Sequence, residues 1–140
     1  RSLSSAASDV YKRQELIISS YKSAYNSIWT LFGCGGNRDK SKRNKMFKIA
    51  KKYSQKIFIT SDNSRFENFN SIVRDILGED RFDNLEVIKD RDSAIKIAID
   101  TLPKNVPLLI LGRGHEETLS LGKNIINHSD IKAVQRYISL

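Results

Sequence analysis

The sequence has few of the residues that would cross-link the chain or hold it in a membrane. Its one cysteine, Cys34, excludes a disulfide framework and a cysteine-rich zinc site. Its longest apolar run, residues 108–111, is far shorter than the roughly 18 residues of a membrane span. No secretory signal pattern stands near the first residue. With 140 residues, 39% of them hydrophobic, the chain can form one domain with a core. We therefore expect a cytoplasmic protein with no membrane partner.

Basic residues outnumber acidic ones by 24 to 16, which gives a formal net charge of +8. Nine of the basic residues lie in residues 38–56 with a single acid among them. This balance suits nucleic acid, but it equally suits anionic nucleotides or phosphates. A nucleic-acid module needs aromatic side chains free for base stacking, whereas Phe47 and Tyr53 fall on an apolar helical face. We therefore expect no nucleic-acid partner.

The first 14 residues differ in character from the rest. They have no initiator methionine and no clear hydrophobic period, and residues 4–8 are all small. They resemble a spurious peptide that recurs at the ends of translated assembly contigs. We expect them to lie outside the natural domain, which then spans residues 15–140.

From residue 15 onward the hydrophobic period alternates between those of helices and strands. Ile17, Tyr21, Ala24 and Tyr25 share one helical face. The expected helices are residues 17–25, 43–54, 69–77, 95–102 and 129–138. Short apolar runs, typical of strands covered on both faces, occupy residues 27–32, 56–60, 85–88 and 107–111. A hairpin or loop follows the last run. The pattern predicts an α/β fold, a Rossmann-like three-layer domain with a mainly parallel sheet.

In such folds the loops after the strands gather at one edge and carry the ligand site. The loop at residues 33–43 is rich in glycine and leads into a helix, an arrangement that suits an anion. The glycines also permit positive φ and close backbone approach. A tight turn before a solvated basic helix start is the alternative. The candidate residues for the phosphate side are Gly35, Gly36, Arg38, Asp39, Lys40, Lys42 and Arg43.

The other loops are less distinctive on spacing alone. Asp62 or Asn63, after the second strand, could simply cap the next helix, and the acids of residues 89–92 suit a helix start. In the loop after the fourth strand, His115 stands beside Glu116 on the expected ligand edge. His128 is interpreted as incidental. No metal site and no nucleophile with a neighbouring base is predicted.

Taken together, three loops resemble the C-terminal domain of the MurE-type Mur ligases. The stretch FGCGGNRDKSKR is similar to that family's F-G-x-G-G-[DN]-R-D-x-x-K-R segment, TSDNSR to T-S-D-N-P-R, and LILGRGHE to the segment ending in G-K-G-H-E. The stretch SDIKAVQRYI is similar to the family's closing helix. The order and spacing agree, and the resemblance covers about residues 15–140.

The resemblance implies part of an ATP-dependent ligase of peptidoglycan synthesis. Such enzymes form an acyl-phosphate on UDP-N-acetylmuramoyl-L-alanyl-D-glutamate, which the amine of an incoming amino acid attacks. The C-terminal domain holds that amino acid, and the arginine of its D-N-P-R motif marks enzymes that take meso-diaminopimelate rather than lysine. Carried over by position, the implied substrate-binding residues are Asp62, Asn63, Arg65, Gly112 and Glu116. Arg113 and His115 would support the loop, and the basic loop would face the nucleotide and acyl-phosphate.

Two residues depart from the pattern. Ser64 replaces the motif's proline, which frees φ, and Arg113 replaces its lysine, which keeps the charge but not the geometry.

Several parts of the family's enzymes are absent from the sequence. It has no P-loop and neither of the other two domains, and the family's opening strand should precede residue 15. We therefore expect a fragment whose sheet lacks its first strand and which cannot ligate alone, with no catalytic residue of its own. ATP and Mg²⁺ would bind mainly outside it, and UDP-MurNAc-dipeptide would bind through the missing domains. We expect a monomer. The alternatives are a generic nucleotide-binding α/β domain and a lysine-adding member of the same family.

Overall fold

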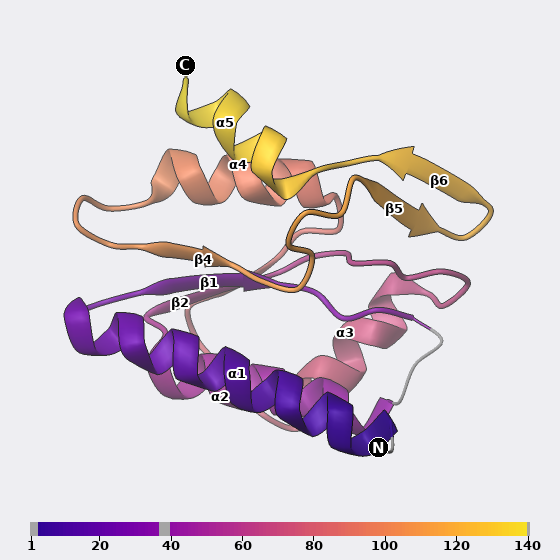
Figure 1. Cartoon of the computed structure of the whole chain (residues 1–140), viewed down its shortest axis with the longest axis horizontal. Coiled ribbons are helices and arrows are strands. Elements are labelled where there is room, and N and C mark those ends of the chain that lie inside the picture. The colour runs from indigo at the N-terminus through magenta and orange to yellow at the C-terminus, as the bar shows by residue number, and fades with distance from the viewer. Residues whose placement is uncertain (1–2, 37–39, 140) are drawn as a thin grey trace.

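The computed structural model describes residues 3–36 and 40–139. Helices and strands alternate along most of the chain (Figure 1). The helices are α1 (Leu3–Ala24), α2 (Arg43–Tyr53), α3 (Phe69–Leu77), α4 (Arg91–Thr101) and α5 (Asp130–Ile138), with a 3₁₀ turn, η1, at Lys40–Lys42. The strands are β1 (Trp29–Phe32), β2 (Lys56–Ile59), β3 (Leu85–Val87), β4 (Leu108–Ile110), β5 (Thr118–Leu121) and β6 (Asn124–Asn127).

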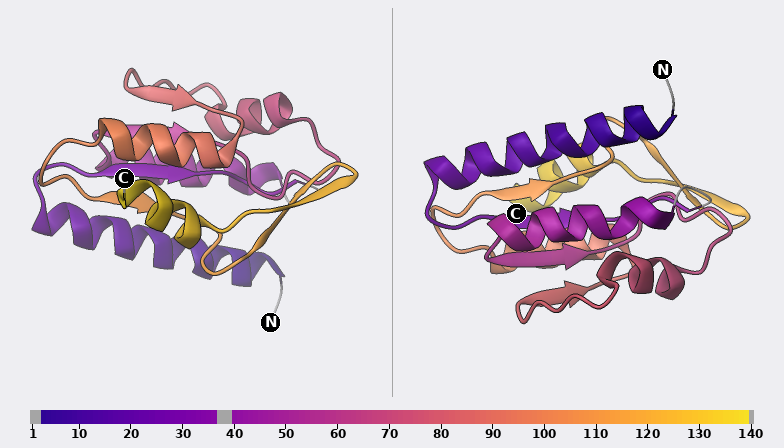
Figure 2. Two further views of the ribbon diagram at one scale, coloured as in Figure 1. Left: turned by 90° about the horizontal axis from the view of Figure 1, so that it is seen from above. Right: turned by 90° about the horizontal axis from the view of Figure 1, so that it is seen from below.

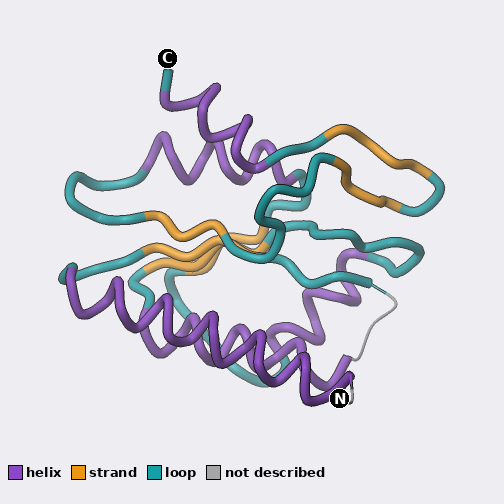
Figure 3. Tube along the Cα trace, in the orientation of Figure 1, coloured by secondary structure: helices purple, strands orange, loops and turns teal. Residues whose placement is uncertain are grey.

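Four strands form one parallel sheet in the order β3-β2-β1-β4. Thr30 of β1 stands opposite Ile57 of β2 on one side and Leu109 of β4 on the other. β5 and β6 form a separate antiparallel hairpin. The hairpin projects at the end of the molecule where the loops after the parallel strands gather (Figure 3). The expected ligand edge is therefore also the edge that the hairpin borders.

Helices cover both faces of the sheet (Figures 1 and 2). Successive side chains of a strand point to opposite faces. Phe32 and Ile57 accordingly pack in the core beneath α1, α2 and α3, whereas Leu31 and Phe58 pack in the second core beneath α4 and α5. The predicted three-layer α/β architecture with a parallel sheet is confirmed.

Short polar side chains fix where the helices begin. Asn68 accepts hydrogen bonds from two backbone N–H groups of α3, Asp90 accepts one from Ser93 of α4, and Ser129 accepts one from Lys132 of α5. The alternative in which Asp62 or Asn63 caps α3 is therefore wrong. Gly78 ends α3 with φ 55°, a value that glycine adopts without steric cost.

The first helix differs most from its sequence pattern. It begins at Leu3, inside the stretch that showed no clear period, and the apolar residues expected to share its buried face are largely exposed. Ile17, Tyr21 and Tyr25 are 46%, 43% and 43% exposed, whereas Ile18, one position along, is fully buried. The helix covers the core through a narrow stripe around Ile18, and the rings of Tyr21 and Tyr25 stack on its outside. Whether residues 1–14 belong to the natural domain stays a prediction.

None of the described helices combines the length and the apolar character needed to cross a bilayer.

Candidate functional site

The loops after β1 and β2 are packed backbone to backbone. The N–H of Gly36 donates to the carbonyl of Asn63 over 2.7 Å. A Cβ atom on Gly33 would overlap the backbone of Thr60, and one on Gly36 would overlap that of Ser64. The close backbone approach that these glycines permit therefore occurs, and its partner is the neighbouring loop. Neither glycine has the positive φ that its residue type permits, because the described glycines with positive φ are 78, 112, 114 and 122.

Replacing Gly36 with alanine should separate these two loops. The new methyl group meets backbone atoms of Ser64, which cannot rotate away, so we expect a loss of roughly 1–3 kcal/mol in the free energy of unfolding. Urea unfolding followed by circular dichroism measures it. Gly114→Ala is the matched control, because it forces a side chain onto φ 54° but meets no atom within 4 Å. Equal losses in both variants would mean that the Gly36 contact has no special weight.

Arg65 joins three loops through its backbone and its side chain. Its φ of 53° is in the left-handed region, where an ordinary residue needs support from its surroundings. That support comes from the hairpin, since the N–H of Arg65 donates to Ser120 and its carbonyl accepts from Gly122. One guanidinium nitrogen, Nη1, donates to the carbonyls of Gly36 at 3.0 Å and Asn63 at 3.1 Å. Nε and Nη2 form no hydrogen bond with the described residues, so that edge of the fork is available.

The side chain of Asn63 connects the loop after β2 to the loop after β4 and to β5. Its carbonyl oxygen Oδ1 accepts from the N–H of Ser120 in β5 over 2.9 Å. Its amide nitrogen Nδ2 donates to Glu116 Oε2 over 3.2 Å. The structure thus brings Asn63, Arg65 and Glu116 together from loops that are about 50 residues apart in sequence.

Asp62 is buried behind these side chains. Burial raises the pKa of Asp62 above its usual value, although the nearby charges of Arg91 and Arg113 and the N–H of Asn63 oppose the rise. Gly112 has φ 106°, and a Cβ atom there would lie 3.2 Å from Asp62 Oδ2. A side chain at Gly112 would therefore press on the carboxylate, which explains why glycine suits this position.

Arg113 lies beneath the last loop and is only 3% exposed. Its Nη1 is 3.3 Å from Glu116 Oε2 and 3.6 Å from Asp62 Oδ1. Its Nη2 donates to the carbonyls of Thr118 at 2.7 Å and His128 at 3.0 Å. His115, the other residue expected to support the loop, is exposed, and its side chain has no hydrogen bond or ion pair with the described residues.

A buried charge cluster, which the sequence pattern does not predict, supports the site. Arg91, 1% exposed, donates through Nε and Nη2 to Asp130 at 2.8 Å, and also to the carbonyls of Ser61 and Leu111 at the ends of β2 and β4. His128 Nε2 is 2.7 Å from Asp130 Oδ1. The interpretation of His128 as incidental is therefore wrong, because its ring is buried and paired.

This cluster also controls the charge of Asp130. Burial alone would raise the pKa of Asp130, but the hydrogen bonds from His128 and Arg91 hold that pKa well below its usual value. The carboxylate therefore stays ionised and keeps the loops after β2 and β4 attached to α4 and α5.

Arg43, expected on the phosphate side of the basic loop, is paired with acids of this chain. Its guanidinium is buried against Asp75 and Glu67, each at 2.8 Å. It also donates to the carbonyl of Gly35. Lys40 is exposed and Lys42 half-buried in η1, whereas Arg38 and Asp39 lie outside the described residues. Burial raises the pKa of the nearby Cys34 thiol to about 12, so this thiol is protonated at neutral pH.

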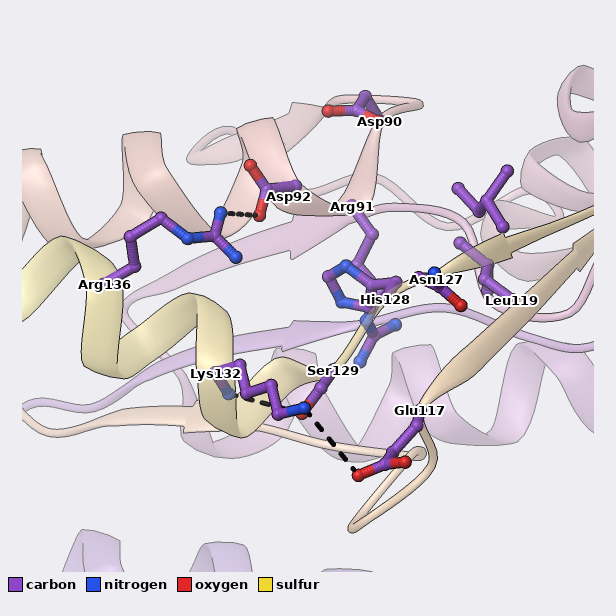
Figure 4. Close-up of a pocket in the computed structure, with 11 residues that line it drawn as sticks. Asp90, Arg91, Asp92, Glu117, Leu119, Asn127, His128, Ser129, Lys132 and Arg136 are labelled. Atoms are coloured by element: carbon purple, nitrogen blue, oxygen red, sulfur yellow. Dashed lines mark hydrogen bonds and ion pairs between the residues drawn. The ribbon is translucent and has the colours of Figure 1, made fainter.

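A cavity of about 540 Å³ lies beside the site, between α4, α5 and the hairpin (Figure 4). Asp92, Glu117, His128, Lys132 and Arg136 are among the residues that line it. Arg136 pairs with Asp92 at 3.0 Å, and Lys132 lies 4.0 Å from Glu117. None of the sequence-predicted site residues lines this cavity, so it is distinct from the surface formed by their loops.

The comparison with known families agrees with the fold and the loops. Residues 14–114 match the family described as "Mur ligase, glutamate ligase domain". The parallel sheet, the helices on both of its faces and this match over most of the chain define the class of protein. The chain belongs to the Mur ligase family and carries its glutamate ligase domain.

Individual relatives narrow the similarity further. The UDP-N-acetylmuramoyl-L-alanyl-D-glutamate--2,6-diaminopimelate ligase of Blochmanniella floridana is 44% identical over 104 residues, which are 74% of this chain and 21% of that protein. The ligase of the same name from Helicobacter hepaticus is 42% identical over 113 residues, 80% of this chain and 24% of that protein. The chain thus spans about a fifth to a quarter of the length of these curated relatives.

A solved structure with the same ligase name superimposes on 92% of this chain and on 27% of its own chain, with a TM-score of 0.87 and 28% identity. A domain from a ligase of Haemophilus ducreyi matches with a TM-score of 0.53 at 11% identity over 92% of this chain and 81% of that one. This second likeness concerns the fold alone.

Proposed function

We propose that this chain is the amino-acid-binding part of an ATP-dependent ligase that adds meso-diaminopimelate to UDP-N-acetylmuramoyl-L-alanyl-D-glutamate. The observation that carries the proposal is that the guanidinium of Arg65 is fixed by hydrogen bonds on one side and has free donors on the other. Its Nη1 is occupied by two backbone carbonyls, which fix the plane of the guanidinium, while Nε and Nη2 have no partner among the described residues. A carboxylate can occupy that free edge with two parallel hydrogen bonds.

The second half of the site suits an ammonium group. Glu116 is exposed and lies within reach of Asn63, on the same surface as Arg65. The far end of meso-diaminopimelate carries one ammonium and one carboxylate, so Glu116 and Arg65 would each take one of them. Lysine has no carboxylate there and would leave Arg65 unpaired, which supplies selectivity. The names of the relatives support the same substrate.

The residues that the structure describes do not by themselves form a site for ATP and Mg²⁺. The described residues include no group of three His, Cys, Asp or Glu side chains placed to hold a metal ion. Arg43, the deepest cation of the basic loop, is already paired with two acids. We propose that the nucleotide, its metal and the UDP-linked substrate bind mainly to the other parts of a longer ligase in the bacterial cytoplasm. This chain would then bind and orient the amino acid.

The test uses the full-length ligase that contains this chain, assayed for ATP-dependent amide formation with meso-diaminopimelate and with L-lysine in parallel. We expect a strong preference for meso-diaminopimelate, and no product from the 140-residue chain alone. Equal use of lysine would keep the ligase assignment but contradict the role given to Arg65. Product formation by the 140-residue chain alone would contradict the proposed division of labour.

A further inference from the structure

One buried guanidinium holds the two acids of the proposed site. Arg113 Nη1 stands between Asp62, from the loop after β2, and Glu116, from its own loop, at 3.6 and 3.3 Å. The same side chain uses Nη2 to hold the carbonyls of Thr118 and His128, at the two ends of the hairpin. Arg113 thus contacts both acids and the hairpin.

The charges at the site balance, and this balance bears on which substrate the site favours. Arg65 and Arg113 supply two positive charges, and Asp62 and Glu116 supply two negative ones. The neighbouring pair of Arg91, which faces Asp62, and Asp130, whose Oδ1 lies 3.9 Å from Arg113 Nε, adds one charge of each sign. A neutral site matches the far end of meso-diaminopimelate, which is zwitterionic and neutral overall. The far end of lysine carries a net positive charge, which a site with one extra negative charge would favour.

We infer that Arg113 is a positioning residue of the amino-acid site: its buried guanidinium fixes the separation of the Asp62 and Glu116 carboxylates and supplies the charge that makes the site neutral. Its effect on substrate choice rests on the proposed function. Its hold on Asp62 does not, because that contact exists within this chain.

Two substitutions separate charge from shape. Arg113→Lys keeps the positive charge but has one nitrogen in place of the fork, so it cannot serve the acids and both hairpin carbonyls together. Arg113→Gln removes the charge and keeps N–H donors for the carbonyls. A purely structural role would make the two variants differ only in stability. A positioning role by charge makes them differ at Asp62.

The first experiment follows the Asp62 carboxyl carbon by NMR across a pH titration of the 140-residue chain and both variants. The other groups that face Asp62 are Arg91 of α4, Cys34 and Glu116, and all three stay unchanged. We expect Arg113→Gln to raise the proton affinity of Asp62 on the order of tenfold, and Arg113→Lys to leave it within about twofold. An unchanged Asp62 in a folded Arg113→Gln chain overturns the inference. If that variant does not fold, a tenfold rise in Arg113→Lys overturns it and a rise within twofold supports it.

The second experiment measures kcat/KM of the full-length ligase for meso-diaminopimelate and for L-lysine. We expect Arg113→Gln to lower the ratio of the two values at least tenfold and Arg113→Lys to restore most of it. Equal losses on both substrates would overturn the role in substrate choice. If the wild-type ligase does not prefer meso-diaminopimelate, the proposed function fails, whereas the Asp62 titration, which needs no substrate, still decides whether Arg113 holds that carboxylate.

Discussion

Replacing Asp130 with alanine is expected to lower the free energy of unfolding by about 3–5 kcal/mol. The change leaves the guanidinium of Arg91, which is 1% exposed, without the carboxylate that accepts two of its hydrogen bonds. It also removes the partner of His128. Because a domain of this size is stable by only about 5–15 kcal/mol, this loss is a large part of its total stability. Urea unfolding at pH 7, followed by circular dichroism, measures the loss.

Two further variants test the cause of this loss. Asp100→Ala breaks the pair with Lys96, in which both side chains are about half exposed, and should have a much smaller effect. The double variant Arg91→Met with Asp130→Leu removes both buried charges and should recover part of the lost stability. An Asp130→Ala loss as small as that of Asp100→Ala would mean that the buried pair does not hold the loops.

The same pair predicts how stability responds to acid. The pKa of Asp130 is lower in the folded chain than its ordinary value of 3.8, so ionised Asp130 stabilises the fold fully above that value. This contribution is lost as the pH falls below 3.8 towards the lower folded pKa. The difference in stability between the wild type and Asp130→Asn should therefore be constant from pH 7 to about pH 5 and narrow below pH 4.

The alternation of periods was sufficient to predict the layers and the edge that carries the candidate site. Strand runs such as residues 56–60 are short and apolar because both of their faces are covered, and helices between them force parallel pairing. Parallel strands end at one edge, so the loops containing Asn63 and Glu116 had to lie near each other. The structure adds what spacing cannot give, which is that Asn63 also holds Ser120 of the hairpin.

Contacts between distant charged residues escaped prediction for a physical reason. Arg91 and Asp130 are 39 residues apart, and each looks like an ordinary residue in the first turn of a helix. Arg43 likewise lies in a run of basic residues that the sequence pattern places in solvent. Only the fold brings Asp75 of α3 and Glu67, which precedes α3, to its guanidinium. The hydrophobic period also failed to identify the buried face of α1. This helix covers the core through a narrow stripe, so its tyrosines stay exposed.

Within the full-length ligase, Arg65→Ala is expected to lower kcat/KM for meso-diaminopimelate by about 10- to 100-fold, the size of a lost hydrogen-bonded charge pair. Its effect on L-lysine should be much smaller, because lysine has no distal carboxylate to lose a partner. Arg65→Lys should recover only part of the activity, since one ammonium cannot both hold the Gly36 and Asn63 carbonyls and bind a carboxylate through two bonds.

The two Arg65 variants carry the same conformational strain in the backbone at this position. Both keep a side chain at φ 53°, so a difference between them reflects the guanidinium and not relief of strain. Arg74→Ala, an exposed charge change on α3 away from these loops, controls for net charge and should leave both substrates unaffected. Steady-state kinetics with both amino acids provide the measurement. An equal fall in kcat/KM for L-lysine would show that Arg65 supports the loops but does not bind the distal carboxylate, because only that carboxylate distinguishes the two amino acids.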